Sequence, residues 1–361
     1  LEQKEISDMI NADYVETLTQ CYCENHLGSL ETMAGNYGKT IRYQVAYNKA
    51  LEVERSALYV SIPENEALGR PAMDFQKTMS AAVHLGRKKR YSFECAAEYA
   101  NAYGQNHEDL FWWVKRSLMS GMNAQVLHGA SYSGAYFGKF SEDGNIPGVE
   151  WPGYEAFRKA VSNYWNRTLS LEDARECMDT IARMNTLFLK KAKVDCAIYR
   201  QSYFNSGLGS EFCLYPDDGQ LANQGYTYET VSPSLLELPV CKIEDKLLDK
   251  NGVGYKCLIV PEQNAVSYAF LLKAKEMLDA AFPILWIGRK PSHSLFYSEW
   301  DKPENREEWG ILMNQLWESE HMIHVDSLEE VPRELRKHNI LPSVQLDGAV
   351  DLTTALRVDE E

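Results

Sequence analysis

Apolar positions in the first half of the chain follow two alternating periodicities. Between residues 13 and 37 they recur at helical spacing, which predicts a helix stopped by Gly35 and Gly38. The predicted strands are IRYQVAY (41–47), SALYVSIP (56–63), RYSFECA (90–96) and AQVLHGA (124–130), with helices at 73–86 and 107–122. Strands joined by helices of this length pair in parallel, so this half predicts part of a β/α barrel or an open α/β sheet.

A second α/β series begins at Val194. Its predicted strands are 194–200, 255–261, 283–288 and 321–326, and its predicted helices are 267–281, 306–319 and 327–338. Strands with near-continuous apolar runs indicate a small doubly wound parallel sheet covered on both faces. No G-x-G-x-x-G follows its first strand, so dinucleotide binding is unsupported. The stretch 201–250 has no clear pattern.

Two further segments separate these series. Residues 131–165 are rich in Gly, Tyr and Trp without periodicity, which is typical of a long functional loop. After them an amphipathic helix begins, with Ser170 as its predicted N-cap, and connects the two halves.

Size and charge restrict the classes of function. A chain of 361 residues suits two domains, and 45% hydrophobic with 25% charged residues is ordinary for a globular protein. The net charge of −15 argues against a binder of nucleic-acid backbones, and the one basic cluster, Arg87 to Arg90, is interpreted as a solvated helix end. No apolar window of eighteen residues indicates a membrane span, so neither nucleic acid nor membrane is expected as a partner.

The eight cysteines lack the spacing of a disulfide framework. Together with an N-terminus that has no signal-peptide pattern, they predict a reducing compartment and a cytoplasmic location. Cys21 and Cys23 form a C-x-C pair, but no second pair or histidine stands at zinc spacing. No cofactor is evident from the residues.

Candidate chemistry gathers where the first four strands end. In parallel sheets and barrels the active site lies at the carboxyl ends of the strands. In this sequence the residues at or near those ends are Gln44, Glu66, Glu94 and His128. Paired carboxylates among amide, imidazole and aromatic groups suit glycoside hydrolysis, which needs an acid for the leaving oxygen and a base or nucleophile. The aromatic side chains expected to bind a sugar ring are Tyr47, Tyr132 and Trp151.

Each of these residues also has a structural interpretation. Glu64 is predicted to be an exposed loop residue, and Glu66 in the same loop is either surface charge or functional. Glu94 lies between Phe93 and Cys95, so a buried carboxylate with a partner is expected. An ion pair of Glu94 with Arg42 or Arg90, and a core role for His128, stay open.

The order of motifs resembles a known family. YCENHLGSLETMAGNYGKTIRYQ, SIPENEAL, MSAAVHLGRKKRYSFECAA, NAQVLHGASYS and EWPG resemble the C-terminal half of the catalytic domain of glycoside hydrolase family 106, the α-L-rhamnosidases. The later DCAIYR, YKCLIVPEQNAV and ILWIGRKP resemble the α/β domain that follows. The resemblance spans about residues 10 to 330.

The resemblance implies roles for individual residues. Glu66 and Glu94 match glutamates that are candidate catalytic or sugar-binding carboxylates, and Gln44, His128 and Trp151 match positions around the pocket. Family members are described as calcium-dependent inverting enzymes. No calcium-ligand series is evident in this sequence, so calcium rests on the resemblance alone.

We therefore expect an α/β protein made of a partial TIM-type (β/α) barrel followed by a small flavodoxin-like domain. The expected boundaries are 1–168 for the barrel part, 169–345 for the connector helix and second domain, and 346–361 for a tail. The expected function is an α-L-rhamnosidase-like hydrolase of carbohydrate, as a fragment of a longer enzyme. A retaining β-galactosidase-like hydrolase, a non-catalytic carbohydrate-binding module and a homo-oligomer with a shared site stay open.

Overall fold

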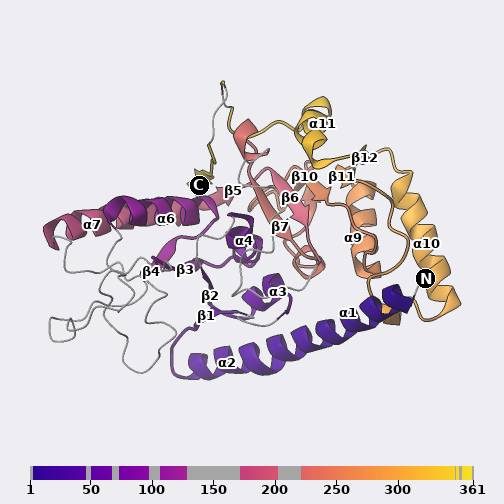
Figure 1. Ribbon diagram of the computed structural model, residues 1–361, viewed down its shortest axis with the longest axis horizontal. Coiled ribbons are helices and arrows are strands. Elements are labelled where there is room, and N and C mark those ends of the chain that lie inside the picture. The colour runs from indigo at the N-terminus through magenta and orange to yellow at the C-terminus, as the bar shows by residue number, and fades with distance from the viewer. Residues whose placement is uncertain are drawn as a thin grey trace, which may run out of the picture.

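The computed structural model describes residues 3–45, 50–66, 73–96, 106–127, 171–201, 221–345, 347–348 and 352–359. Within these ranges the chain forms two parallel β-sheets with helices packed around them (Figure 1). The predicted mixed α/β class with parallel sheets is confirmed.

The first sheet has four parallel strands in sequential order, β1-β2-β3-β4. Short helices lie between its strands along the chain. The strands are β1 (Arg42–Gln44), β2 (Ile62–Glu66), β3 (Ser92–Cys95) and β4 (Ala124–Leu127), and the helices are α3 (Val53–Leu58), α4 (Met73–Lys77), α5 (Ser80–Leu85) and α6 (His107–Met119).

The strand predicted at 56–63 is wrong in its boundaries. Residues 56–58 end α3, and the strand begins only at Ile62. The alternating pattern of 56–63 fits a strand, but Ser56 N donates to the Glu52 carbonyl at 3.1 Å, which closes a helical turn. In a run of eight residues, apolar periodicity alone does not distinguish a strand from a helix.

The two faces of β3 differ in chemistry. Phe93 and Cys95 are fully buried, and the Phe93 ring lies 6.3 Å from that of Trp113 on α6. Successive strand residues point to opposite faces, so Ser92 and Glu94 lie on the face away from this helix. Asn106 caps α6 reciprocally with Asp109, which fixes where the covering helix begins.

A long helical segment precedes the first sheet and runs along one side of the molecule (Figure 1). It consists of α1 (Gln3–Cys21), a π-helical stretch η1 (Tyr22–Leu27) and α2 (Gly28–Asn36). The helix begins ten residues before the predicted start at residue 13. Only Met9 and Ala12 are buried in that first part, so apolar periodicity gave little signal there.

The second sheet has five parallel strands in the order β12-β11-β10-β6-β7. One face packs its side chains against α11, and the other faces the core that includes α9 and α10. The strands are β6 (Cys196–Tyr199), β7 (Tyr228–Val231), β10 (Cys257–Val260), β11 (Ile284–Ile287) and β12 (Met322–Val325); the helices are α7 (Leu171–Phe188), α8 (Pro233–Leu236), α9 (Tyr268–Asp279), α10 (Pro303–Trp317) and α11 (Val331–Lys337).

Several elements occur where the sequence gave no pattern. The stretch 201–250 contains β7 and α8, together with the hairpin β8 (Ile243–Glu244) and β9 (Leu247–Leu248). In the predicted tail, β13 (Leu356–Val358) pairs antiparallel with β5 (Lys191–Lys193). Short 3₁₀ turns complete the described elements at η4 (Ala222–Gln224), η5 (Tyr297–Glu299) and η6 (Leu328–Glu330).

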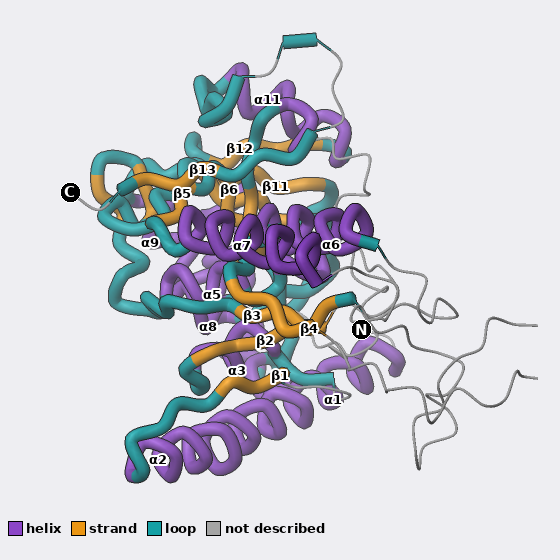
Figure 2. Tube along the Cα trace, turned by 90° about the vertical axis from the view of Figure 1, so that its left-hand side faces the viewer, coloured by secondary structure: helices purple, strands orange, loops and turns teal. Residues whose placement is uncertain are grey.

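The two sheets share one hydrophobic core. A single cluster of buried side chains contains Phe93 and Trp113 from the first half and Leu258 and Trp286 from the second. Figure 2 shows α6 and α7 side by side beside both sheets. Side chains from both sides of the domain boundary predicted between residues 168 and 169 therefore pack in the same core. The boundary itself stays a prediction. No described helix is both long and apolar enough to cross a membrane.

Candidate active site

A row of polar side chains covers one face of the first sheet. In the parallel register Gln44 is level with Glu64, and Glu64 with Ser92. One layer further along, Glu66 is level with Glu94. Level residues on parallel strands, and residues two apart on one strand, share a face, so all five side chains lie on the face away from α6.

Gln44 and Glu94 are joined by a hydrogen bond. Gln44 Nε2 donates to Glu94 Oε2 at 2.6 Å and lies 3.4 Å from Glu64 Oε1. Glu94 is half-buried. The sequence predicted that the Glu94 carboxylate has a partner, and this partner is the side-chain amide of Gln44. The alternative ion pair with Arg42 is wrong, because the Arg42 guanidinium pairs with Glu64 instead.

Glu64 is not the exposed loop residue that the sequence predicted. It lies inside β2 with its side chain 8% exposed. Its Oε2 accepts from Ser92 Oγ at 2.6 Å and lies 3.2 Å from Arg42 Nε. The signal that would have found it is the two-residue spacing of Glu64 and Glu66 in IPENE, which puts both on one face once this run is taken as a strand.

Glu66 ends β2 and is half-buried. Between the two glutamates, Asn65 points to the opposite face and is 2% exposed. Asn65 Nδ2 donates to the Phe75 carbonyl at 3.1 Å, and its Oδ1 accepts from Glu66 N at 2.8 Å. These bonds fix the end of β2, and with it the position of Glu66 beside Glu94.

Among the described side chains, the polar face carries more negative than positive charge. Three carboxylates, Glu64, Glu66 and Glu94, share it there with the guanidinium of Arg42. Behind the sheet, burial raises the pKa of the Cys95 thiol, and the charges of Glu94 and then Glu64 raise it further. A carboxylate-rich face with an amide donor can accept sugar hydroxyls and can move protons.

The structure brings together three of the predicted site residues, Gln44, Glu66 and Glu94. The other four, Tyr47, His128, Tyr132 and Trp151, lie outside the described residues, so their predicted roles stay predictions.

The calcium ion that the resemblance implies stays a prediction. Among the described residues, no group of three or more His, Cys, Asp or Glu side chains could hold a metal. On the polar face, the Gln44 amide donates to Glu94, and the Arg42 guanidinium pairs with Glu64.

Two parallel sheets, one of them with a face of carboxylates, define an α/β protein with a candidate acid–base site. A comparison with known families shows which family the chain belongs to. The sequence profile of glycoside hydrolase family 106, described as alpha-L-rhamnosidase, matches residues 3–359. The chain belongs to this family, as its motif order predicted.

Solved structures give a second comparison. A rhamnosidase from Novosphingobium sp. PP1Y has a similar fold, with a TM-score of 0.75 and 18% sequence identity. The similarity covers 98% of this chain and 34% of that one, so the chain spans about a third of that relative's length. A search of curated proteins finds no match.

Proposed function

We propose that the protein hydrolyses terminal α-L-rhamnosides and that the polar face of the first sheet is its active site. The observation that carries this proposal is the register of Glu66 with Glu94, which puts two carboxylates side by side on that face. Membership of family 106 supports the choice of sugar.

We further propose that the first sheet is part of a (β/α) barrel. Four parallel strands in sequential order, with helices between them, repeat the unit of that fold. The backbones of β1 and β3 are about two strand spacings, roughly 9.5 Å, apart. The Gln44–Glu94 hydrogen bond spans this interval over β2, which supports side chains that converge on a concave inner face. The remaining strands would come from chain outside these residues, as the 34% coverage of the relative supports.

The second sheet supports a flavodoxin-like domain. Numbered in chain order, its strands stand as 2-1-3-4-5, which is the order of that fold. Most of its strand residues are buried, so we propose that it braces the barrel part without taking part in the reaction.

The spacing of the two carboxylates bears on the mechanism. Level residues on neighbouring strands have backbones about 4.8 Å apart, close to the 5–5.5 Å of a retaining pair and below the 6.5–9.5 Å that an inverting pair needs. We propose an inverting reaction because the resemblance to family 106 implies one. In it Glu66 or Glu94 activates water, and a third carboxylate further away, rather than the other member of this pair, protonates the leaving oxygen. The rival supported by the register is a retaining reaction in which both act as a pair, as in β-galactosidase-type enzymes.

Hydrolysis of aryl glycosides by the full-length protein tests the proposal. We expect release of L-rhamnose from 4-nitrophenyl α-L-rhamnoside and none of galactose from the β-galactoside. Proton NMR of the first anomer released then separates inversion from retention. Binding of L-rhamnose without turnover of any glycoside would instead support a carbohydrate-binding module.

A further inference from the structure

The row of side chains that contains the two candidate catalytic carboxylates ends in an apolar residue. Glu66 on β2 is level with Glu94 on β3, and Glu94 is level with Val126 on β4. Level residues on neighbouring parallel strands share a face and have backbones about 4.8 Å apart. Val126 is therefore the next side chain beside Glu94, on the side away from Glu66.

The row before it along the strands ends in the same way. Glu64 is level with Ser92, and Ser92 is level with Ala124. From β2 to β4 the polar face thus changes from carboxylates to the alkyl side chains of Ala124 and Val126, which are both half-buried. Among the described residues, neither of these two belongs to a hydrophobic core cluster of the protein.

The other face of β4 is packed against helices. Gln125 Oε1 accepts from Asn185 Nδ2 on α7 at 2.6 Å, and Gln125 Nε2 donates to Ser117 Oγ on α6 at 3.4 Å. Leu127 packs against the core cluster that the two sheets share. Because successive strand residues point to opposite faces, these contacts direct Val126, which stands between Gln125 and Leu127, onto the polar face.

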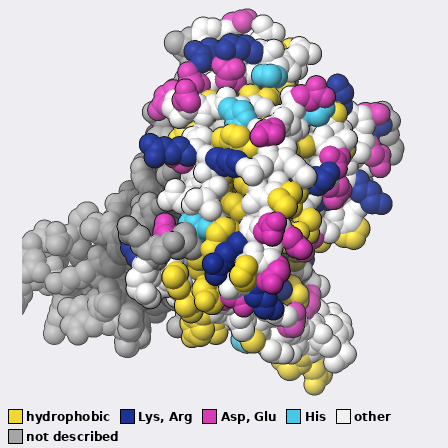
Figure 3. Space-filling view, turned by 90° about the vertical axis from the view of Figure 1, so that its right-hand side faces the viewer, with side chains coloured by type: hydrophobic (Ala, Val, Ile, Leu, Met, Phe, Trp, Pro, Cys, Tyr) yellow, Lys and Arg dark blue, Asp and Glu magenta, His cyan; other side chains and the backbone are white. Residues whose placement is uncertain are grey.

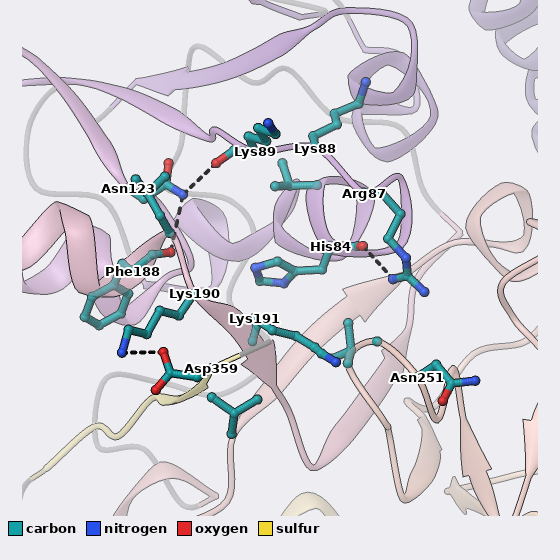
Figure 4. A pocket seen from close by; sticks show the side chains of 16 residues that line it. His84, Arg87, Lys88, Lys89, Asn123, Phe188, Lys190, Lys191, Asn251 and Asp359 are labelled. Carbon is teal, nitrogen blue, oxygen red and sulfur yellow. Dashed lines mark hydrogen bonds and ion pairs between the residues drawn. The ribbon is translucent and has the colours of Figure 1, made fainter. Parts of the chain in front are cut away.

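Position along the strands distinguishes this row from other surfaces of the molecule. A cavity of about 720 Å³ at the amino ends of β3 and β4 is lined by five Lys and Arg side chains, and Figure 4 shows Lys190 paired there with Asp359. On the face shown in Figure 3, acidic and basic side chains are interspersed. Substrates of (β/α) barrels bind toward the carboxyl ends of the strands, which is where Glu66, Glu94 and Val126 lie.

A rhamnose ring has a matching distribution of groups. Its hydroxyl groups need hydrogen-bond partners, and its C5 carries a methyl group where mannose carries a hydroxymethyl group. C5 is joined to the anomeric carbon through the ring oxygen, so the methyl carbon lies within one strand spacing, about 4.8 Å, of the reaction centre. When the anomeric carbon is beside Glu94, a methyl group directed toward β4 meets Val126, and hydroxyl groups directed toward β2 meet carboxylates.

We propose that Val126 contacts the C5 methyl group of the bound sugar and makes the active site selective for 6-deoxy sugars. A hydroxymethyl group would bring a hydroxyl against the valine side chain, which offers it no hydrogen bond. A sugar with only hydrogen at this position would leave the contact unmade. This inference rests on the proposed function, because it assigns a substrate contact in the same active site.

The kcat/KM values of the full-length protein for three aryl glycosides test the proposal. 4-Nitrophenyl α-L-rhamnoside carries the methyl group, whereas the α-L-lyxoside has a hydrogen and the α-L-mannoside a hydroxymethyl group in its place. The parent should prefer the rhamnoside to the lyxoside by roughly 10- to 200-fold. In V126A this preference should fall about tenfold, and the mannoside should gain about tenfold relative to the rhamnoside, because the smaller side chain leaves room for the hydroxymethyl group.

Two further variants separate this contact from an effect on the fold. V126T keeps the shape of valine but adds a hydroxyl beside the methyl group, so the preference for the rhamnoside over the lyxoside should fall there as well. V358T makes the same change in a half-buried strand valine of β13 and should keep the ratios of the parent. A variant that only disturbs the fold lowers all three kcat/KM values together, whereas loss of the methyl contact changes their ratios.

Two results would overturn this inference alone. They are parent-like ratios in both V126A and V126T, or an equal change of the ratios in V358T. If the parent does not hydrolyse the rhamnoside at all, the proposed function is wrong and this inference fails with it.

Discussion

Gln44 Nε2 lies 2.6 Å from Glu94 Oε2, so an amide on β1 donates to a carboxylate on β3 across the strand between them. The same nitrogen lies 3.4 Å from Glu64 Oε1. Gln44 therefore orients Glu94 and links it by hydrogen bonds to Glu64 on the polar face. Gln44 is a positioning residue for a candidate catalytic carboxylate.

Replacing Gln44 by Leu tests this positioning role. A hydrogen bond to a charged group contributes about 1.5–3 kcal/mol, so kcat should fall roughly 10- to 100-fold if Glu94 acts in the reaction. We expect KM to change less than kcat, because the bond orients a reacting group. Steady-state kinetics on an aryl rhamnoside measure both. A rise in KM at unchanged kcat would show that Gln44 binds sugar and does not position Glu94.

The buried ion pair between Glu54 and Arg200 should stabilise the joint between the halves. Their side chains are 0% and 4% exposed, and Arg200 Nη1 pairs with Glu54 Oε1. E54Q removes the carboxylate that pairs with the buried Arg200 guanidinium, so it should lower the free energy of unfolding by about 3–5 kcal/mol.

Urea denaturation measures this cost against a matched exposed pair. Arg333 Nη2 lies 2.6 Å from Glu330 Oε1 at the surface. E330Q should therefore lower the free energy of unfolding by less than about 1 kcal/mol. Equal effects of the two variants would contradict the role given to Glu54.

Glu52 should make the protein less stable as the pH rises. Burial, followed by the charge of Glu54, raises the pKa of Glu52 from 4.5 to about 7, although the Ser232 and Ser234 hydroxyls lower it. The folded state therefore holds a proton that the unfolded state has lost between these two pH values. Stability from this group is complete below pH 4.5 and is lost as the pH rises through 7.

The variant E52Q isolates this contribution. A shift of that size corresponds to roughly 3 kcal/mol, so E52Q should gain stability relative to the parent at pH 8 by up to that amount and little at pH 5. Denaturation at the two pH values gives the difference. If parent and variant differ in free energy of unfolding by the same amount at pH 5 and at pH 8, this would contradict a raised pKa for Glu52.

The fold was predictable wherever periodicity covered whole elements. The apolar strands CLIV and ILWI were placed correctly because burial on both faces marks them in the sequence. The helix that carries Trp113 was placed correctly because its buried residues recur at helical spacing. The strand at 62–66 was misplaced, because IPENE contains three polar residues in five. One face of that strand is the polar face, and the buried Asn65 on the other face is satisfied by the Phe75 carbonyl.

The site was predictable to the extent that strand ends identify it. Gln44, Glu66 and Glu94 were expected at one edge and lie together on one face. Glu64 was missed because its burial depends on Ser92 and Arg42, which lie far from it along the chain. The Glu54–Arg200 pair joins residues 146 positions apart, and no local pattern predicts such a contact.

The most direct test of the central claim is the turnover of 4-nitrophenyl α-L-rhamnoside by E94Q and E66Q variants of the full-length protein, beside E108Q. Glu108 is an exposed glutamate at the start of α6, so E108Q keeps the parent rate. General acid–base groups contribute about 10²–10⁴-fold, and the account predicts a loss of that size in E94Q or E66Q with the fold retained. Parent-like rates in both variants would contradict an active site on the polar face of the first sheet.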